Sequence, residues 1–344
     1  MMNKFVYRRL LIPVIVVLLL FTYNTASANA DINAYPVNFK NADFTRDASK
    51  LMYSEKNGIY FYSFTDIRTK GKKFHKNSIN GSKIKSKKLF RKLGSLPVFY
   101  ISGSDNNILL PYIKKDMQHF VCYNLKGKEL YHVKCRVPNL IKKGSYIIYD
   151  FVSKGNKIYY VADYGTRTKK HGESFYTHII SINKKTGRLL SDKILSSNNV
   201  EYDKVLIVGK KIYGLTDNTV FVYSLSGKRL NEYILPEGEK TKSCRVTSDG
   251  SIVKDFDFHS IFVKGKNIYY VNRNGIYRLN TSENSEFQLF YDAKNDKYFS
   301  DCSLVYGIRE IYIVNDKEFY ISFNNTYDYE SDVPVVILKY LSDK

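Results

Sequence analysis

A short apolar motif recurs along the chain at nearly equal spacing, and this repetition constrains the fold more than any other feature. The text "GNKIYYV" (155–161) returns as "GKNIYYV" (265–271), and in shorter form as "KKIYGL" (210–215) and "NGIYFYS" (57–63). The first apolar residue of the motif falls at six positions that are 49 to 56 residues apart: Ile59, Ile108, Ile158, Ile212, Ile268 and Phe319. A period near fifty residues is typical of propeller blades and is longer than helical or leucine-rich repeats.

Each repeat unit reads as two hairpins. An apolar segment such as 204–208 or 260–264 precedes the motif, and a turn containing Gly or Asn separates the two. A second hairpin follows, as in 220–234, where Ser226 and Gly227 supply the turn. A four-stranded antiparallel unit cannot bury both faces alone, so stacked units are expected. The sequence therefore predicts an all-β, six-bladed β-propeller, with the tyrosine after most motif residues packed between blades.

The two ends of the chain are expected to share the last blade. The sixth unit offers a third strand at 335–341, but the chain stops three residues later. Residues 33–39 precede the first unit and belong to none of its strands. We expect this segment to be the outer strand of the last blade, which closes the ring. Pro36 is tolerated there because an outermost strand is an edge.

The first thirty residues have the features of a secretory signal peptide. Lys4, Arg8 and Arg9 are followed by a twelve-residue apolar run at 10–21, and the small residues at 26–30 suit cleavage before Asp31. The run is short for a membrane span, although an uncleaved anchor is the alternative. We expect residues 31–344 to form one domain outside the cytoplasm, secreted and without a transmembrane span once the signal is removed.

The chain is strongly basic, with a net charge of +21 that falls to +18 when Lys4, Arg8 and Arg9 are removed with the signal. Such a charge attracts polyanions over long distances, although net charge alone does not identify a partner. Export argues against nucleic acid. Anionic cell-wall polymers, acidic polysaccharides or a protein of the cell envelope fit the expected compartment, as does a surface that is merely solvated.

Catalytic and metal-binding motifs are absent from the sequence. There is no G-x-S-x-G, P-loop, H-E-x-x-H or C-x-x-C pattern, so no catalytic residue and no cofactor is predicted. In "DFDFH" (255–259), strand alternation would place Asp255, Asp257 and His259 on one face. These side chains could hold a divalent ion, but one strand rarely supplies a full set of ligands, so we expect a solvent-exposed strand without metal.

Two long loops are candidates for ligand binding, because loops on rigid scaffolds often carry function. They are 162–176 and 324–334, and a further insertion at 236–250 is expected to form its own hairpin. Asp163 and Asp217 follow equivalent strands, where they could act as acid and base on an acidic polysaccharide or simply cap turns. The candidate ligand-binding residues are Asp163, Arg167, Lys169, Lys170, His171, Glu173, Asp217, Asp328 and Glu330.

The densest positive charge lies in 68–92, which contains no acidic residue. It is either a contact surface for a polyanion or an edge protected by lysines against strand pairing. The candidate contacts are Lys70, Lys72, Lys73, Lys83, Lys85, Lys87, Lys88 and Arg91.

The chain has four cysteines, so disulfides are considered. Cys122 should face residue 131 across its hairpin, which leaves Cys135 too far along the strand for a direct bond with Cys122. Cys244 and Cys302 are therefore the better disulfide pair, and free buried thiols are the alternative.

The motif "IYYV" followed by "GIYRLN" (275–280) resembles six-bladed propellers of the TolB-like and YWTD (low-density-lipoprotein-receptor-like) type. The resemblance covers about residues 33–344, but the Trp-Thr-Asp part of the YWTD signature is missing because the chain has no Trp. It implies a binding or scaffold protein and transfers no catalytic residue. The rival hypothesis is an extracellular hydrolase or lyase that uses carboxylates in the propeller funnel.

Overall fold

The computed structural model describes most of the predicted strands, and every complete element in the described part is a β-strand. The described residues are 32–36, 47–54, 58–65, 73–78, 83–84, 107–114, 117–124, 128–136, 146–168, 172–195, 200, 202–237, 243–246, 252–256, 259–283, 285–297, 299, 307–324 and 336–342. No helix in this part of the chain has the length and apolar character needed to traverse a bilayer.

The strands form six larger antiparallel sheets, which we number 1 to 6 in chain order, and one separate hairpin. Sheet 1 contains β2 (Asp47–Ser54), β3 (Gly58–Thr65), β4 (Lys73–Ser78) and β5 (Lys83–Ile84). Sheet 2 contains β6 (Asn107–Lys114), β7 (Met117–Asn124) and β8 (Glu129–Arg136). Sheet 3 contains β9 (Tyr146–Lys154), β10 (Lys157–Thr168), β11 (Gly172–Asn183) and β12 (Leu189–Ile194).

The second half of the chain repeats this pattern. Sheet 4 contains β13 (Lys204–Val208), β14 (Lys211–Leu215), β15 (Thr219–Ser224) and β16 (Arg229–Ile234). A hairpin of β17 (Ser243–Val246) and β18 (Ile252–Phe256) follows, as predicted for the insertion. Sheet 5 contains β19 (Ser260–Lys264), β20 (Asn267–Asn272), β21 (Gly275–Asn280) and β22 (Gln288–Asp292). Sheet 6 contains β23 (Gly307–Asn315), β24 (Glu318–Asn324), β25 (Val336–Ser342) and β1 (Ile32–Pro36).

The repeated motif occupies the same place in every sheet, because each of its six first apolar residues is the second residue of a strand: β3, β6, β10, β14, β20 and β24. Ile158, Ile212, Ile268 and Phe319 are completely buried. The turns before three of these strands contain a glycine with positive φ, such as 59° at Gly265. This backbone region is disfavoured for other residues, which explains why glycine recurs there.

Both ends of the chain contribute to sheet 6. β1 pairs with β25 in antiparallel register, from Ile32 opposite Ser342 to Pro36 opposite Leu338, and it is the outermost strand of that sheet. Pro36 therefore lies on an edge strand, where a missing N–H is tolerated.

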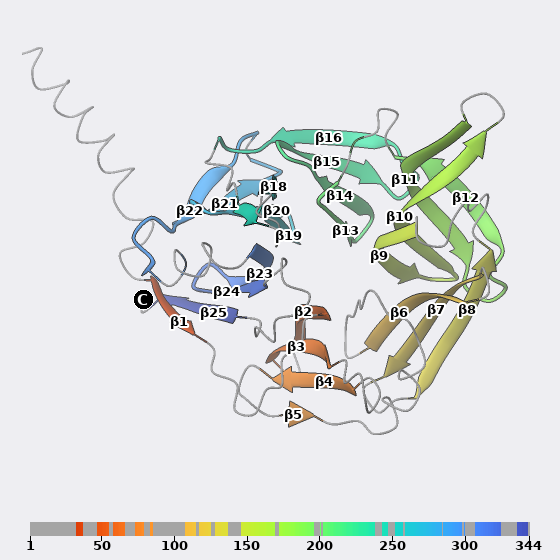
Figure 1. Ribbon diagram of the computed structural model, residues 1–344, viewed down its shortest axis with the longest axis horizontal. Helices are drawn as coiled ribbons and strands as arrows, with labels where there is room; N and C mark the ends of the chain where they lie inside the picture. The colour runs from red at the N-terminus through yellow and green to blue at the C-terminus, as the bar shows by residue number, and fades with distance from the viewer. Residues whose placement is uncertain are drawn as a thin grey trace, which may run out of the picture.

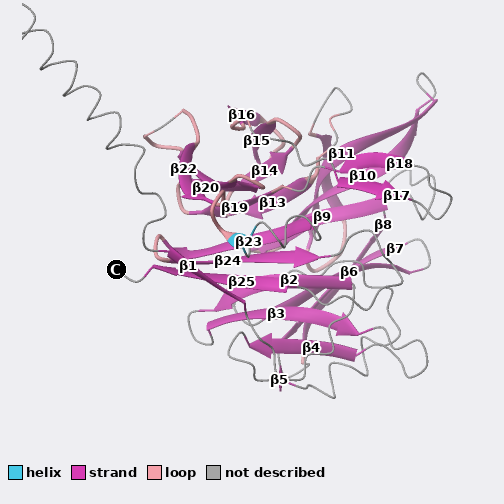
Figure 2. Ribbon diagram, turned by 60° about the vertical axis from the view of Figure 1, so that its left-hand side comes forward, coloured by secondary structure: helices cyan, strands magenta, loops and turns pink. Residues whose placement is uncertain are grey.

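The sheets stand around a common centre, which is the arrangement of a β-propeller (Figure 1). The first strands of five sheets lie side by side in the order β9, β13, β19, β23 and β2. Figure 2 shows the same strands after a turn of 60° about the vertical axis.

Four hydrophobic clusters lie between neighbouring sheets and form the core. They join sheet 2 to 3, 3 to 4, 4 to 5, and 5 to 6. The predicted packing of the repeated tyrosine is confirmed at Tyr213, between sheets 4 and 5, and at Tyr269, between sheets 5 and 6. Both faces of a sheet are covered by its neighbours, so both can be apolar.

Two local predictions are wrong. Residues 162–176 are not mainly a loop, because β10 and β11 extend as a long hairpin in which Thr168 lies opposite Gly172. "DFDFH" is not one strand, because β18 ends at Phe256 and β19 begins at Ser260. His259 therefore lies in no strand, and Asp257 is outside the described residues. The segment at 97–102, predicted as the first strand of the second unit, lies outside the described residues.

Candidate functional site

One charged side chain links each pair of neighbouring inner strands from β9 to β23. Asp150 of β9 is buried, and its Oδ2 accepts the backbone N–H of Ile207 in β13 at 2.7 Å. Lys204 of β13 donates from Nζ to Ser260 Oγ at the start of β19, at 2.7 Å. Lys264 at the end of β19 donates to the backbone oxygens of Ile313 and Val314 in β23. Lys204 and Ser260 are the first residues of β13 and β19, and Lys264 ends β19 beside the last residues of β23. The first strands of sheets 4, 5 and 6 therefore run in the same direction.

The two predicted funnel carboxylates have different surroundings. Asp163 accepts the hydroxyl of Tyr149 at 2.6 Å and that of Thr177 at 2.5 Å, one on each oxygen. Asp217 lies exposed between β14 and β15 and makes no ion pair or side-chain hydrogen bond within the described residues. Asp163 is therefore a structural acceptor within sheet 3, and the two carboxylates do not form the acid and base pair of the rival hypothesis.

The remaining predicted residues are mostly outside the described part. Arg167 and Glu173 lie opposite each other in the β10–β11 hairpin. Lys73 begins β4 and Lys83 begins β5, on the outer side of sheet 1. The residues outside the described part are Lys70, Lys72, Lys85, Lys87, Lys88, Arg91, Lys169, Lys170, His171, Asp328 and Glu330. Their assigned contacts stay predictions.

The cysteine predictions are only partly testable. Cys122 lies opposite Tyr131, as predicted, and both Cys122 and Cys135 are buried free thiols. Cys244 lies in β17, but Cys302 is outside the described residues, so the predicted disulfide stays a prediction.

A polar cluster between sheets 4 and 5 combines side chains that are common in active sites. His259 is hydrogen-bonded through Nε2 to Asp203 at 3.0 Å and through Nδ1 to the hydroxyl of Tyr270 at 3.2 Å. The Lys204–Ser260 bond lies next to it. Ser260 is completely buried, however, so a substrate cannot reach its hydroxyl. The cluster holds the two sheets together through the contacts of His259 with Asp203 and Tyr270.

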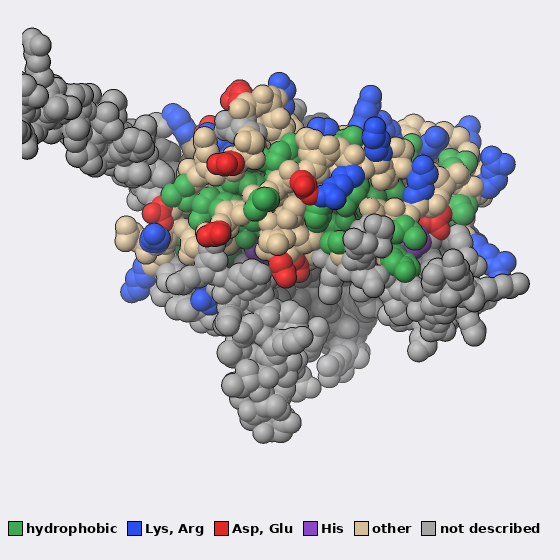
Figure 3. Space-filling view, turned by 90° about the horizontal axis from the view of Figure 1, so that it is seen from above, with side chains coloured by type: hydrophobic (Ala, Val, Ile, Leu, Met, Phe, Trp, Pro, Cys, Tyr) green, Lys and Arg blue, Asp and Glu red, His purple; other side chains and the backbone are tan. Residues whose placement is uncertain are grey.

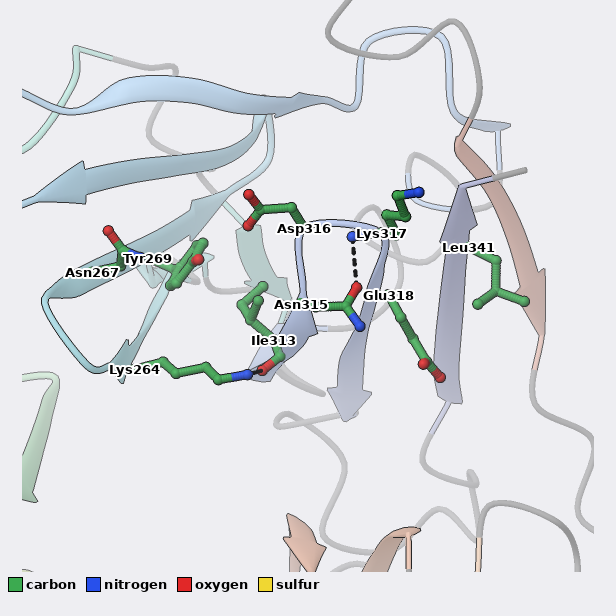
Figure 4. Close-up of a pocket in the computed structure, with 9 residues that line it drawn as sticks. All are labelled: Lys264, Asn267, Tyr269, Ile313, Asn315, Asp316, Lys317, Glu318 and Leu341. Carbon is green, nitrogen blue, oxygen red and sulfur yellow. Dashed lines mark hydrogen bonds between the residues drawn. The ribbon is translucent and has the colours of Figure 1, made fainter. Parts of the chain in front are cut away.

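A groove of about 650 Å³ lies between the first turns of sheets 5 and 6 (Figure 4). Its charged lining residues are Lys264, Asp316, Lys317 and Glu318. Three of these are already paired: Lys264 with backbone oxygens of β23, Asp316 with Arg278 at 3.0 Å, and Glu318 with Lys339 at 3.5 Å. The two lysines and two acids balance, so this groove has no preference for an anion.

The turns at one end of sheets 3 and 4 carry positive charge only. In each sheet the first and second strands, and the third and fourth, are joined at this end. The four turns, 154–157, 184–188, 209–211 and 225–228, contain no Asp or Glu. Seven of their basic residues are exposed, and together we call them the basic turn surface: Lys154, Lys157, Lys185, Arg188, Lys210, Lys211 and Lys228.

The basic turn surface spans two neighbouring sheets, because sheets 3 and 4 pack together through one hydrophobic cluster. Their first strands are also in contact, where Asp150 of β9 accepts the N–H of Ile207 in β13. None of the seven side chains makes an ion pair or a hydrogen bond within the described part of the chain. Figure 3 shows the molecule from above, with many Lys and Arg side chains and some Asp and Glu side chains on the face in view.

The opposite end of sheet 4 is acidic by comparison. Asp203, Asp217 and Glu237 are exposed there, and Asp203 is paired with His259. Charge is therefore distributed unevenly between the two ends, and the basic end has no acid to neutralise it locally. Sequence reasoning offered 68–92 as a candidate contact surface, which stays a prediction, and did not identify these turns, because their lysines are separated in the chain and come together only when the sheets stand side by side.

Comparisons with known proteins find no shared family and only distant likenesses among solved structures. No family model and no curated protein matches the chain. Among solved structures, BamB from Moraxella catarrhalis has a TM-score of 0.40 at 9% identity, covering 85% of this chain and 83% of that chain. The WD40 β-propeller domain of Doa1 has a TM-score of 0.42 at 10% identity, covering 86% and 78%. The WD40 domain of Neurospora crassa Pan2 has a TM-score of 0.42 at 8% identity, covering 91% and 96%.

Proposed function

We propose that the chain is an exported six-bladed β-propeller that binds an anionic polymer of the cell envelope through the basic turn surface. The observation that carries this proposal is the set of four turns in sheets 3 and 4, which present seven exposed basic side chains and no acid. The groove between sheets 5 and 6 has balanced charge, and in the polar cluster Ser260 is buried and Asp203 is paired with His259, so neither offers a comparable contact.

Six blades and a closed ring are part of this proposal. Six units carry the motif at the same strand position, and β1 supplies the fourth strand of sheet 6. β2 of sheet 1 also lies beside β23 of sheet 6, which supports contact between the first and last blades. Membership in the TolB-like or YWTD groups is likewise a proposal, supported by the motif text.

Export is supported by the first thirty residues, with their basic start, apolar run and small residues before Asp31. Outside the cytoplasm, the abundant polyanions are polymers with repeated phosphate or carboxylate groups. A polymer of this kind contacts several lysines at once, so weak individual contacts add up.

The basic turn surface suits such a ligand for physical reasons. Its charges stand on turns of sheets whose cores are packed against their neighbours, so the spacing of the charges is set by the fold. Each exposed ion pair contributes only about 0.2–1 kcal/mol, so affinity needs several pairs together. Binding is expected to be fast and sensitive to salt, with little selectivity for polymer sequence.

The test compares two triple variants of equal net charge. One neutralises Lys185, Lys210 and Lys211 of the basic turn surface, and the matched control neutralises the exposed Lys294, Lys297 and Lys317 of sheets 5 and 6, each by substitution with Gln. Binding to poly(glycerol phosphate) and to polygalacturonate is measured in 0.1 M NaCl, and the two polymers distinguish phosphate from carboxylate recognition.

We expect the turn variant to lose about tenfold in affinity, which corresponds to three exposed contacts. The control should stay within about twofold, because long-range attraction beyond the Debye length is largely screened at this salt concentration. Equal losses in both variants would mean that only net charge matters, and failure of the wild-type chain to bind either polymer would contradict the proposal.

A further inference from the structure

Two histidines and a tyrosine converge on one face of sheet 2. Nδ1 of His119 in β7 lies 2.8 Å from Nε2 of His132 in β8. The hydroxyl oxygen of Tyr112 in β6 lies 3.4 Å from the same Nε2. Three neighbouring strands therefore direct two imidazole nitrogens and one phenol oxygen to a single point.

Strand register explains the convergence. Tyr112 lies directly opposite His119, and His132 lies opposite Val121. Because alternate residues of a strand share a face, His119 and His132 are diagonal neighbours on the same face. The rings of Tyr112 and His119 are stacked, with centroids 4.5 Å apart and an interplanar angle of 18°.

We propose that His119 and His132, with Tyr112 beside them, bind one divalent transition-metal ion of the class of Cu²⁺, Ni²⁺ or Zn²⁺. Imidazole nitrogen is a preferred ligand for these ions, at about 2.0–2.1 Å for Zn²⁺. Two nitrogens bound to one tetrahedral ion are about 3.3 Å apart at that bond length, so the pair must open by about half an ångström. His132 is exposed, so this opening and the entry of the ion need no rearrangement of the core.

A neutral imidazole binds a metal through one ring nitrogen and carries its hydrogen on the other. The two nitrogens that face each other are Nδ1 of His119 and Nε2 of His132, so a shared ion would place the ring hydrogens on Nε2 of His119 and Nδ1 of His132.

The site has two protein nitrogens, so water or an external ligand would fill the other positions. No group of three or more His, Cys, Asp or Glu suitable for a metal exists within the described residues, so this is a weaker site than a closed structural one. The Irving–Williams order then predicts that Cu²⁺ binds more tightly than Ni²⁺ or Zn²⁺. The proposal is independent of polymer binding.

The test uses the purified chain titrated with Cu²⁺ and, separately, with Zn²⁺. We expect one Cu²⁺ per wild-type chain, with two imidazole nitrogens in its electron paramagnetic resonance spectrum, and a higher Tm in the presence of Zn²⁺. His132→Gln changes an exposed side chain, so this variant should keep the fold and lose at least tenfold in Cu²⁺ affinity. His119→Gln should lose binding as well, but it removes a buried ring and is the secondary variant.

Lys134→Gln is the matched control, because Lys134 lies opposite His119 and on the same face as His132. This variant keeps both imidazoles and removes a repulsive charge, so we expect equal or tighter Cu²⁺ binding. Retention of wild-type affinity in His132→Gln would show that the ion binds elsewhere and would overturn the proposal. Loss of binding in Lys134→Gln, or no binding by the wild-type chain, would also overturn it.

Discussion

Asp150 offers the sharpest test of how neighbouring sheets are held together. Its side chain is only 6% exposed. Oδ1 accepts the N–H of Phe151 at 2.9 Å, and Oδ2 accepts the N–H of Ile207 in the next sheet at 2.7 Å. Both donors belong to inner strands, so the carboxylate satisfies two backbone groups beside the centre of the molecule.

Asp150→Ala removes both acceptors. Each unsatisfied buried N–H costs about 1–3 kcal/mol, and relief of the carboxylate's own desolvation offsets part of that cost. We therefore expect the free energy of unfolding to fall by about 2–4 kcal/mol, a large fraction of the usual 5–15 kcal/mol. For a domain of this size that is a fall in Tm of about 3–6 °C. Asp150→Asn keeps one acceptor oxygen, so its loss should be smaller.

The assay is urea denaturation followed by circular dichroism, together with hydrogen exchange of the Ile207 amide. Asp217→Ala is the control, because Asp217 is exposed and makes no ion pair or side-chain hydrogen bond within the described residues, and it should change stability by less than about 0.5 kcal/mol. Faster exchange at Ile207 should accompany the loss of stability in Asp150→Ala. Wild-type stability and unchanged exchange at Ile207 would refute the assigned role of Asp150.

Two further predictions concern buried packing. Gly214→Ala should destabilise the chain by about 1–3 kcal/mol, because the added Cβ would lie 2.4 Å from the buried ring of Tyr202; a thermal melt equal to wild type would contradict this. Burial raises the pKa of Cys135 from about 9 to about 11. The stability contributed by this neutral thiol is therefore complete below pH 9 and is lost as pH rises to about 11. At pH 8 iodoacetamide should modify Cys135 far more slowly in the native chain than in urea, as measured by mass spectrometry of its peptide; equal rates would show that the thiol is accessible.

Sequence patterns predicted the strands well where turns and apolar alternation coincide. The segments 204–208 and 260–264 are β13 and β19 with the same bounds, because a glycine turn and a buried motif residue define each register. The segment 162–176 was mistaken for a loop because it is polar. Its residues nevertheless continue the pairing of β10 with β11, since backbone hydrogen bonds extend a hairpin regardless of side-chain polarity.

Contacts between sheets could not be predicted in the same way. Asp150 and Ile207 are 57 residues apart, and only the docking of sheet 3 on sheet 4 brings them together. The His119–His132 pair was accessible in principle, because the hairpin turn fixes which residues are diagonal neighbours. It was missed because metal ligands were sought at short spacing along the chain, and not across a strand pair.

The salt dependence of polymer binding tests the central claim most directly. The dissociation constant for poly(glycerol phosphate) is measured from 0.05 to 0.3 M NaCl for the wild-type chain and for the variant with Gln at positions 185, 210 and 211. We predict that binding weakens with salt in both and that the slope is shallower in the variant, because fewer ion contacts are screened. Identical slopes, or an affinity that does not change with salt, would contradict binding through the basic turn surface.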